Sequence, residues 1–175
     1  MKLISFTVPC YNSYEYMGKC IESLLPGGED VEIIIVDDGS VDDTDKVADS
    51  YAAHYPDIVK VIHQENGGHG EAVNTGLKNA TGLFFKVVDS DDWVDLDAYK
   101  EVLKTLKNLT KEQITLDMLI TNFVYEKVSD NHQRRMLLSP LFSENEVFGW
   151  DGMKRNIKGF TILMHSVIYR TQMLL

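Results

Sequence analysis

The chain has 175 residues, of which 44% are apolar, and its formal net charge is −10 at neutral pH. This length and apolar content suffice for one domain with a buried core. The acidic balance argues against a nucleic-acid surface, which would need a basic stripe, and any anionic ligand must be held by local groups. Cys10 and Cys20 give no disulfide framework, and no apolar run approaches the length of about 18 residues that spans a membrane, so we expect a cytoplasmic location without a transmembrane segment.

Short apolar runs alternate with helical patterns over the first part of the chain. The runs predict strands over residues 3–9, 31–36, 58–62 and 83–88, and helices are predicted over residues 14–25, 43–55 and 70–80. Short aliphatic runs suit parallel strands that are covered on both faces. The alternation with short connections predicts an α/β fold with a mostly parallel central sheet flanked by helices.

The rhythm changes after Trp93. A long amphipathic helix is predicted over residues 95–109, followed by strands over 118–126 and 136–141, a short helix over 151–157 and a strand over 160–169. We expect a smaller, mixed C-terminal part here. Because the last residues are apolar and no closing turn or polar tail follows them, we expect this part to be truncated.

Three carboxylates follow the fourth predicted strand: Asp89, Asp91 and Asp92, closed by Trp93. In an extended backbone Asp89 and Asp91 point to the same face, where two like charges repel unless a cation lies between them. Hard oxygen ligands suit Mg²⁺ or Mn²⁺, and such ions usually complete their shells with water and substrate phosphates. The run predicts a metal site for a diphosphate, with a solvated acidic turn as the alternative.

Polar or glycine-rich segments also follow the other predicted strands, at residues 11–12, 37–40 and 65–70. In an open parallel sheet, ligands bind outside the carboxyl ends of the strands. Each segment also has an ordinary structural interpretation: an Asp that caps a helix, a half-buried strand-end Tyr, or a glycine-rich loop. Together, four such ends on one edge indicate a binding site.

Residues 1–110 closely resemble the family 2 glycosyltransferases of bacterial type. The resemblance rests on four motifs in a fixed order: Val8-Pro9-Cys10-Tyr11-Asn12, then Ile35-Val36-Asp37-Asp38-Gly39-Ser40 with Asp43-Thr44, then Asn66-Gly67-Gly68 with Asn74 and Gly76, then Asp89-Ser90-Asp91-Asp92. It implies an inverting, nucleotide-sugar-dependent enzyme of the GT-A fold. Residues 1–110 would be the donor-binding region, and residues 111–175 would begin the acceptor side of the same domain.

The resemblance also implies roles for individual residues. Pro9, Tyr11 and Asp38 would line the base pocket, the loop 67–69 and Asn74 would flank the ribose and diphosphate, and Asp89 would face the ribose or sugar. The implied nucleotide-sugar-binding set is Pro9, Tyr11, Asn12, Asp38, Gly67, Gly68, His69, Asn74 and Asp89, and the implied metal set is Asp89, Asp91 and Asp92. Val73 stands where many members carry an Arg, so His69 or Lys86 is expected to supply the missing cation.

By this resemblance the protein would transfer a sugar from a nucleoside-diphosphate sugar, most simply a UDP-sugar, to a glycan or lipid-linked acceptor. Mn²⁺ or Mg²⁺ would assist, in cell-envelope or capsular polysaccharide synthesis, with peripheral association at the inner face of the membrane. Inversion needs a carboxylate base. The acids of the second half lie in no recognisable motif, and the base is expected beyond Leu175; these acids are Glu126, Asp130, Glu144, Glu146 and Asp151.

Three other functions remain open. A non-catalytic nucleotide-sugar-binding module would differ from the enzyme only in turnover. A sugar-phosphate nucleotidyltransferase would normally carry a loop rich in glycine and basic residues after the first strand, and residues 11–19 contain a single Gly and a single Lys. A receiver-like signalling domain also gathers carboxylates and Mg²⁺ at strand ends, but it would leave the Tyr11-Asn12 element unused.

Overall fold

The computed structural model describes residues 1–127, 132–149 and 162–175. It divides into two compact units, one formed by Met1–Asp117 with Tyr169–Leu175 and the other by Met118–Ile168. The helix predicted over residues 151–157 lies outside the described residues, as do the start of the strand predicted over 160–169 and two of the candidate bases, Asp130 and Asp151.

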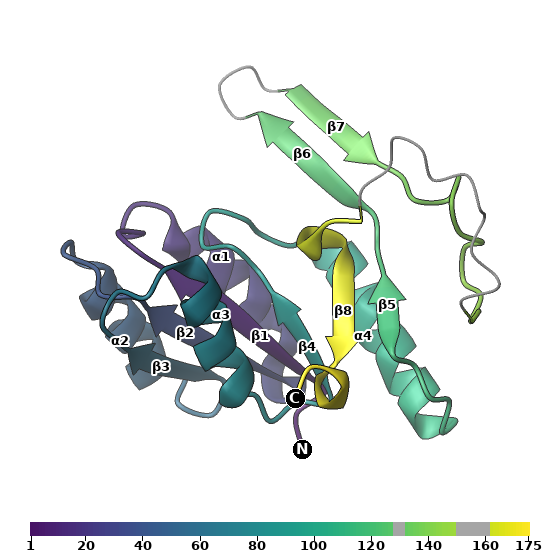
Figure 1. Cartoon of the computed structure of the whole chain (residues 1–175), viewed down its shortest axis with the longest axis horizontal. Coiled ribbons are helices and arrows are strands. Elements are labelled where there is room, and N and C mark those ends of the chain that lie inside the picture. Colours follow the sequence, from purple (N-terminus) through teal and green to yellow (C-terminus); the bar gives the residue numbers. More distant parts are fainter. Residues whose placement is uncertain (128–131, 150–161) are drawn as a thin grey trace. The chain divides into compact units, whose positions relative to one another are not determined.

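A parallel sheet forms the centre of the first unit (Figure 1). Its strands lie in the order β3-β2-β1-β4 and are β1 (Ile4–Cys10), β2 (Val31–Asp37), β3 (Val59–His63) and β4 (Phe84–Val87). Each predicted strand begins at the observed first residue or one residue before it. The end of β8 (Val167–Arg170) pairs antiparallel with β4, so that Arg170 lies opposite Phe84.

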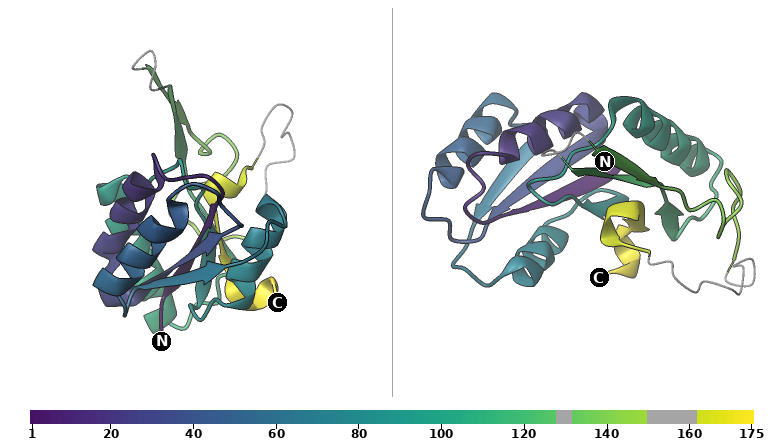
Figure 2. Two further views of the ribbon diagram at one scale, coloured as in Figure 1. Left: turned by 90° about the vertical axis from the view of Figure 1, so that its left-hand side faces the viewer. Right: turned by 90° about the horizontal axis from the view of Figure 1, so that it is seen from above.

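Helices cover both faces of this sheet, which explains why β1 is buried along its whole length and β2 at all but one residue. The helices α1, α2 and α4 lie on one face and α3 on the other (Figure 2). Their bounds are Met17–Leu24 for α1, Thr44–His54 for α2, His69–Lys78 for α3 and Leu96–Lys111 for α4, and short 3-10 helices occupy Leu25–Asp30 and Thr171–Met173. The predicted α/β arrangement is confirmed.

The core of the first unit is closely packed where α3 meets the sheet. A Cβ built on Gly76 of α3 would lie 2.8 Å from Thr7 Cβ in β1, and closer still to the other atoms of that side chain. This glycine therefore lets α3 approach the sheet.

Cys10 and Cys20 are free, buried thiols of the first unit. Burial raises the pKa of Cys10 to about 12, and it also raises the pKa of Cys20.

The second unit differs from the sequence prediction. The strand predicted over 118–126 is two strands, β5 (Met118–Ile120) and β6 (Phe123–Lys127), and β6 pairs antiparallel with β7 (His132–Met136). The strand predicted over 136–141 is wrong. Instead, Leu138, Leu141 and Phe142 form a small buried cluster against Ile120 and Ile162. A 3-10 helix, Met164–Ser166, precedes β8.

In the described residues, no helix has both the length and the apolar character needed to cross a bilayer.

Candidate functional site

The loops that follow β1, β2 and β4 are tied together at the carboxyl edge of the sheet. The Asn12 backbone N–H donates to Ser40 Oγ over 3.0 Å, and the hydroxyls of Ser13 and Ser90 lie 2.9 Å apart in buried surroundings. Tyr11 is half exposed beside these bonds. Pro9 is buried within β1. Three of the four predicted strand ends therefore form one connected edge.

Gly39 brings the loop after β2 against the loop after β3. Its φ is +71°, a left-handed conformation that L side chains rarely adopt. A Cβ at this position would lie 2.8 Å from the backbone nitrogen of Asn66. Both the conformation and the space require glycine here, and the two loops can approach each other only because of it.

Asp38 holds the glycine loop. Its Oδ1 accepts hydrogen bonds from Gln64 Nε2 at 2.7 Å and from the Gly67 N–H at 2.9 Å, and its Oδ2 accepts from the Gly68 N–H at 2.8 Å. Burial alone would raise the pKa of Asp38, but these hydrogen bonds outweigh it and hold the pKa below its usual range. The carboxylate is thus engaged by protein donors, whereas the sequence placed it at the edge of a base.

Replacing Asp38 by asparagine should lower the free energy of unfolding by about 2 kcal/mol, because an amide nitrogen would face a backbone N–H donor and charge-assisted hydrogen bonds would be lost. Urea denaturation at neutral pH measures the loss. The difference from the wild type should shrink as the pH falls through the folded-state pKa of Asp38, because protonation then removes the same bonds from the wild type.

The exposed Asp57 provides a matched control, since Asp57→Asn makes the same chemical change away from the glycine loop. It should leave stability within about 0.5 kcal/mol of the wild type. Equal effects of the two substitutions would contradict the role of Asp38 as the clamp of the loop.

The acidic run forms a turn, and the extended backbone assumed from the sequence is wrong. The Asp92 N–H donates to the Asp89 carbonyl over 2.9 Å, so the chain reverses at Ser90 and Asp91. This places a carboxylate oxygen of Asp89 and one of Asp92 within 4.8 Å of each other. Asp91 is exposed at the same turn. Two oxygen ligands at this separation suit a small hard cation.

A histidine and a lysine lie near this turn. His69 Nε2 lies 2.9 Å from Asp89 Oδ1. Lys86 is buried in β4, where burial lowers the pKa of its amine to about 8 while the charges of Asp92 and Asp89 oppose that shift. The two residues expected to replace the missing Arg therefore both lie near the carboxylates. Lys19 of α1 lies over the ring of Trp93, with Nζ 2.9 Å from the centroid, in a cation–π contact.

Asn74 has a partner on its own helix, and three of the candidate bases belong to the second unit. Asn74 donates to Glu71 on its own helix, over 3.4 Å. Glu126, Glu144 and Glu146 are exposed side chains of the second unit.

Sequence reasoning missed the hydroxyls of Ser13, Ser40 and Ser90, because no local pattern links residues so far apart. It also assigned no role to His63, the last residue of β3, whose ring contacts Asp37. The sequence did offer one signal: Asp37 and Asp38 are adjacent acids, and only Asp38 was given a role.

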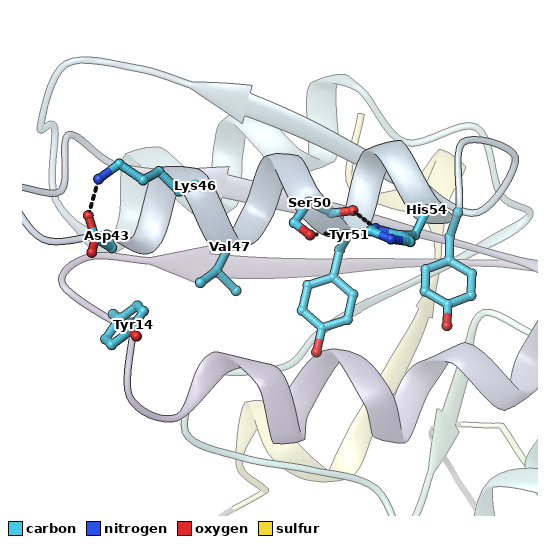
Figure 3. Close-up of a pocket in the computed structure, with 8 residues that line it drawn as sticks. Tyr14, Asp43, Lys46, Val47, Ser50, Tyr51 and His54 are labelled. Carbon is cyan, nitrogen blue, oxygen red and sulfur yellow. Dashed lines mark hydrogen bonds and ion pairs between the residues drawn. The ribbon is translucent and has the colours of Figure 1, made fainter.

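One open cavity of about 460 Å³ lies away from the predicted residues, along α2 where it faces α1 (Figure 3). Its lining is mainly aromatic and polar: Tyr14, Asp43, Lys46, Val47, Ser50, Tyr51, His54 and Tyr55. The Tyr51 hydroxyl donates to Glu22 of α1 over 3.1 Å. None of the residues predicted to bind nucleotide or metal lines this cavity, so its shape alone identifies no reaction.

Comparison with known proteins decides the family. The model of glycosyl transferase family 2 matches residues 5–170. The chain belongs to this family. It is 36% identical to the uncharacterized glycosyltransferase EpsJ of Bacillus subtilis over 89% of its own length, and 36% identical to the glycosyltransferase GlyG of Streptococcus pneumoniae over 75%.

Solved structures agree with this family 2 assignment. TarS of S. aureus, residues 1–349 in complex with UDP-GlcNAc, matches 99% of the chain with 28% identity and a TM-score of 0.72. The predicted GT-A fold class is thereby confirmed. The chain spans less than half of these proteins: 43% of EpsJ, 42% of GlyG and 46% of the TarS chain.

Proposed function

We propose that this family 2 chain binds the nucleotide-sugar donor of a glycosyltransferase, with a UDP-sugar as the donor and Mn²⁺ or Mg²⁺ as the metal. One observation carries the proposal. The ends of neighbouring parallel strands are tied into a single edge that presents the Asp89–Asp92 carboxylate pair. A nucleotide binds at such an edge, and its diphosphate needs a cation next to those carboxylates.

The metal would neutralise charge that develops on the departing diphosphate. Asp89 and Asp92 fit its oxygen ligands, with Asp91 exposed at the same turn as a further ligand. The remaining parts of the edge would hold the donor: Tyr11 would lie against the base, and Gly67, Gly68 and His69 would flank the ribose and diphosphate. TarS, which has been solved with UDP and with UDP-GlcNAc, supports a uridine donor.

The acceptor is proposed by family likeness alone, as a growing glycan or a lipid-linked sugar of the cell envelope or capsule. Transfer would occur with inversion at the anomeric carbon, and a lipid-linked acceptor would bring the protein to the membrane surface.

Calorimetric titration with UDP, GDP and UDP-GlcNAc, each in Mn²⁺ and in excess chelator, tests the donor site. We expect UDP and UDP-GlcNAc to bind in Mn²⁺, GDP to bind at least tenfold more weakly, and chelator to weaken UDP by at least tenfold, because the carboxylates would then repel the diphosphate. Equal UDP affinity with and without metal would refute the metal site. A preference for GDP would refute the uridine donor.

A further inference from the structure

His63 connects the outer edge of the sheet to the proposed nucleotide edge. It is the last residue of β3, and its side chain is 45% exposed. Its Nδ1 lies 2.9 Å from Oδ2 of Asp37, a carboxylate that is only 6% exposed, and its Nε2 lies 3.2 Å from Oδ1 of Asp49 on α2. The imidazole ring is therefore held between two carboxylates from two different elements.

Asp37 passes this contact on to the loops that follow β2 and β1. Its other oxygen, Oδ1, accepts a hydrogen bond from the Ser40 N–H over 3.1 Å. Ser40 Oγ in turn accepts from the Asn12 N–H, and Asn12 Oδ1 accepts from the Val41 N–H over 2.9 Å. Asn12 has a φ of +51°, so its unusual backbone is maintained by these partners. Tyr11, the proposed base platform, immediately precedes it.

Only the protonated ring satisfies both carboxylates. A neutral imidazole has one N–H, so one of the two acids would face a ring lone pair, whereas the imidazolium donates from both nitrogens. The hydrogen bond to Asp37 raises the pKa of His63, burial opposes the shift, and Asp49 adds to the increase. The charged groups that face the ring are Asp37 from β2 and Asp49 from α2, and β3 is the edge strand of its sheet.

We infer that His63 is a positioning residue for the nucleotide, and that its protonation state sets how firmly the Asp37–Ser40–Asn12 chain of hydrogen bonds holds the base pocket. The inference rests on the proposed donor function. The pKa of His63 is raised in the folded protein. The charged ring therefore supports this chain of hydrogen bonds fully below the ordinary histidine value of about 6.5, and the support is lost as the pH rises through the folded-state pKa. Nucleotide affinity should therefore fall with rising pH.

The test is the UDP dissociation constant in Mn²⁺, measured between about pH 5.5 and about pH 8.5 for the wild type and for His63→Gln. The ionisation of UDP itself cancels in the ratio of the two constants. We expect the ratio to change by roughly fivefold across this range, as for a modest coupling between two sites. His54→Gln is the matched control, because His54 is an exposed histidine on α2 whose Nδ1 contacts a carbonyl of its own helix. It should reproduce the wild-type profile.

A second variant separates positioning from simple support of the fold. Asp49→Asn removes the outer carboxylate, so the His63 titration midpoint, followed by NMR of its ring protons without nucleotide, should move to lower pH. The midpoint of the affinity profile should move with it. This inference alone would be overturned if UDP bound but the ratio of the two dissociation constants did not change with pH. It would also be overturned if Asp49→Asn left the midpoint of the affinity profile unchanged. No UDP binding by the wild type at any pH would overturn the proposed function and the inference together.

Discussion

Replacing Asp91 and Asp92 together by asparagine should abolish the Mn²⁺-dependent part of UDP binding while leaving the fold intact. The turn from Asp89 to Asp92 gathers three acids, and the oxygens of Asp89 and Asp92 lie within 4.8 Å of each other. Asparagine keeps the shape of each side chain but removes the charge that a divalent cation needs. Calorimetry should show at least a tenfold loss of affinity in Mn²⁺, whereas in chelator the variant should bind UDP no more weakly than the wild type, because fewer charges repel the diphosphate.

Thermal unfolding should show that the double variant still folds: relief of the repulsion among the acids offsets part of the loss of Asp92, whose charge favours the protonated amine of buried Lys86. Asp97→Asn with Glu101→Gln on α4 is a matched control, since it also removes two negative charges, here from exposed positions elsewhere in the same unit. The control should bind UDP like the wild type. The single variants then assign the ligand, because the larger loss identifies the acid that contacts the metal. Undiminished binding by the double variant would exclude the turn as the metal site.

Gly76→Ala should lower the free energy of unfolding by about 3 kcal/mol, because the added Cβ would overlap the side chain of Thr7 in β1. Thr7 is fully buried, and its hydroxyl has no hydrogen-bond partner among the described residues. The helix α3 would have to move away from the sheet, and His69 at its first turn would move with it. Urea denaturation measures the stability, and the UDP titration measures the consequence for the edge.

Gly70→Ala is the control on the same helix, since a Cβ there would meet no atom within 4 Å. It should leave stability unchanged or raise it by up to about 1 kcal/mol, through better helix propensity. Combining Gly76→Ala with Thr7→Ala should recover part of the loss, because removing the Thr7 methyl and hydroxyl opens space for the new Cβ. Strictly additive losses would show that the close contact is not the cause.

The first unit could be predicted from the sequence because local patterns determine it. The almost continuous aliphatic run in β2 is typical of a strand covered on both faces, and parallel strands bring their carboxyl ends to one edge. The segments that form the site could therefore be placed at one edge of the sheet from their order in the chain alone. The start of α1 was predicted three residues early, since residues 14–16 form a turn in which the Tyr16 N–H donates to the Ser13 carbonyl.

The second unit could not be predicted in the same way, because distant contacts decide its local structure. The Thr121 N–H donates to the Ser166 carbonyl, and Asn122 Oδ1 accepts from the Leu138 N–H, so the run over 118–126 is interrupted between β5 and β6. The polar strand β7 forms only through its pairing with β6. At the site, the sequence left a turn at Asp89–Asp92 only as the alternative to an extended backbone, because three acids in four residues specify charge but not backbone conformation.

Chemical labelling of the two deeply buried thiols can report transient opening of the first unit. Alkylating reagents attack thiolates, and a cysteine with a raised pKa inside a packed core offers almost none. Each modification of Cys10 or Cys20 therefore marks a moment when β1 or α1 has separated from its neighbours. The rate of labelling, with and without nucleotide, reads out how strongly ligand binding closes this part of the protein, and no label needs to be engineered.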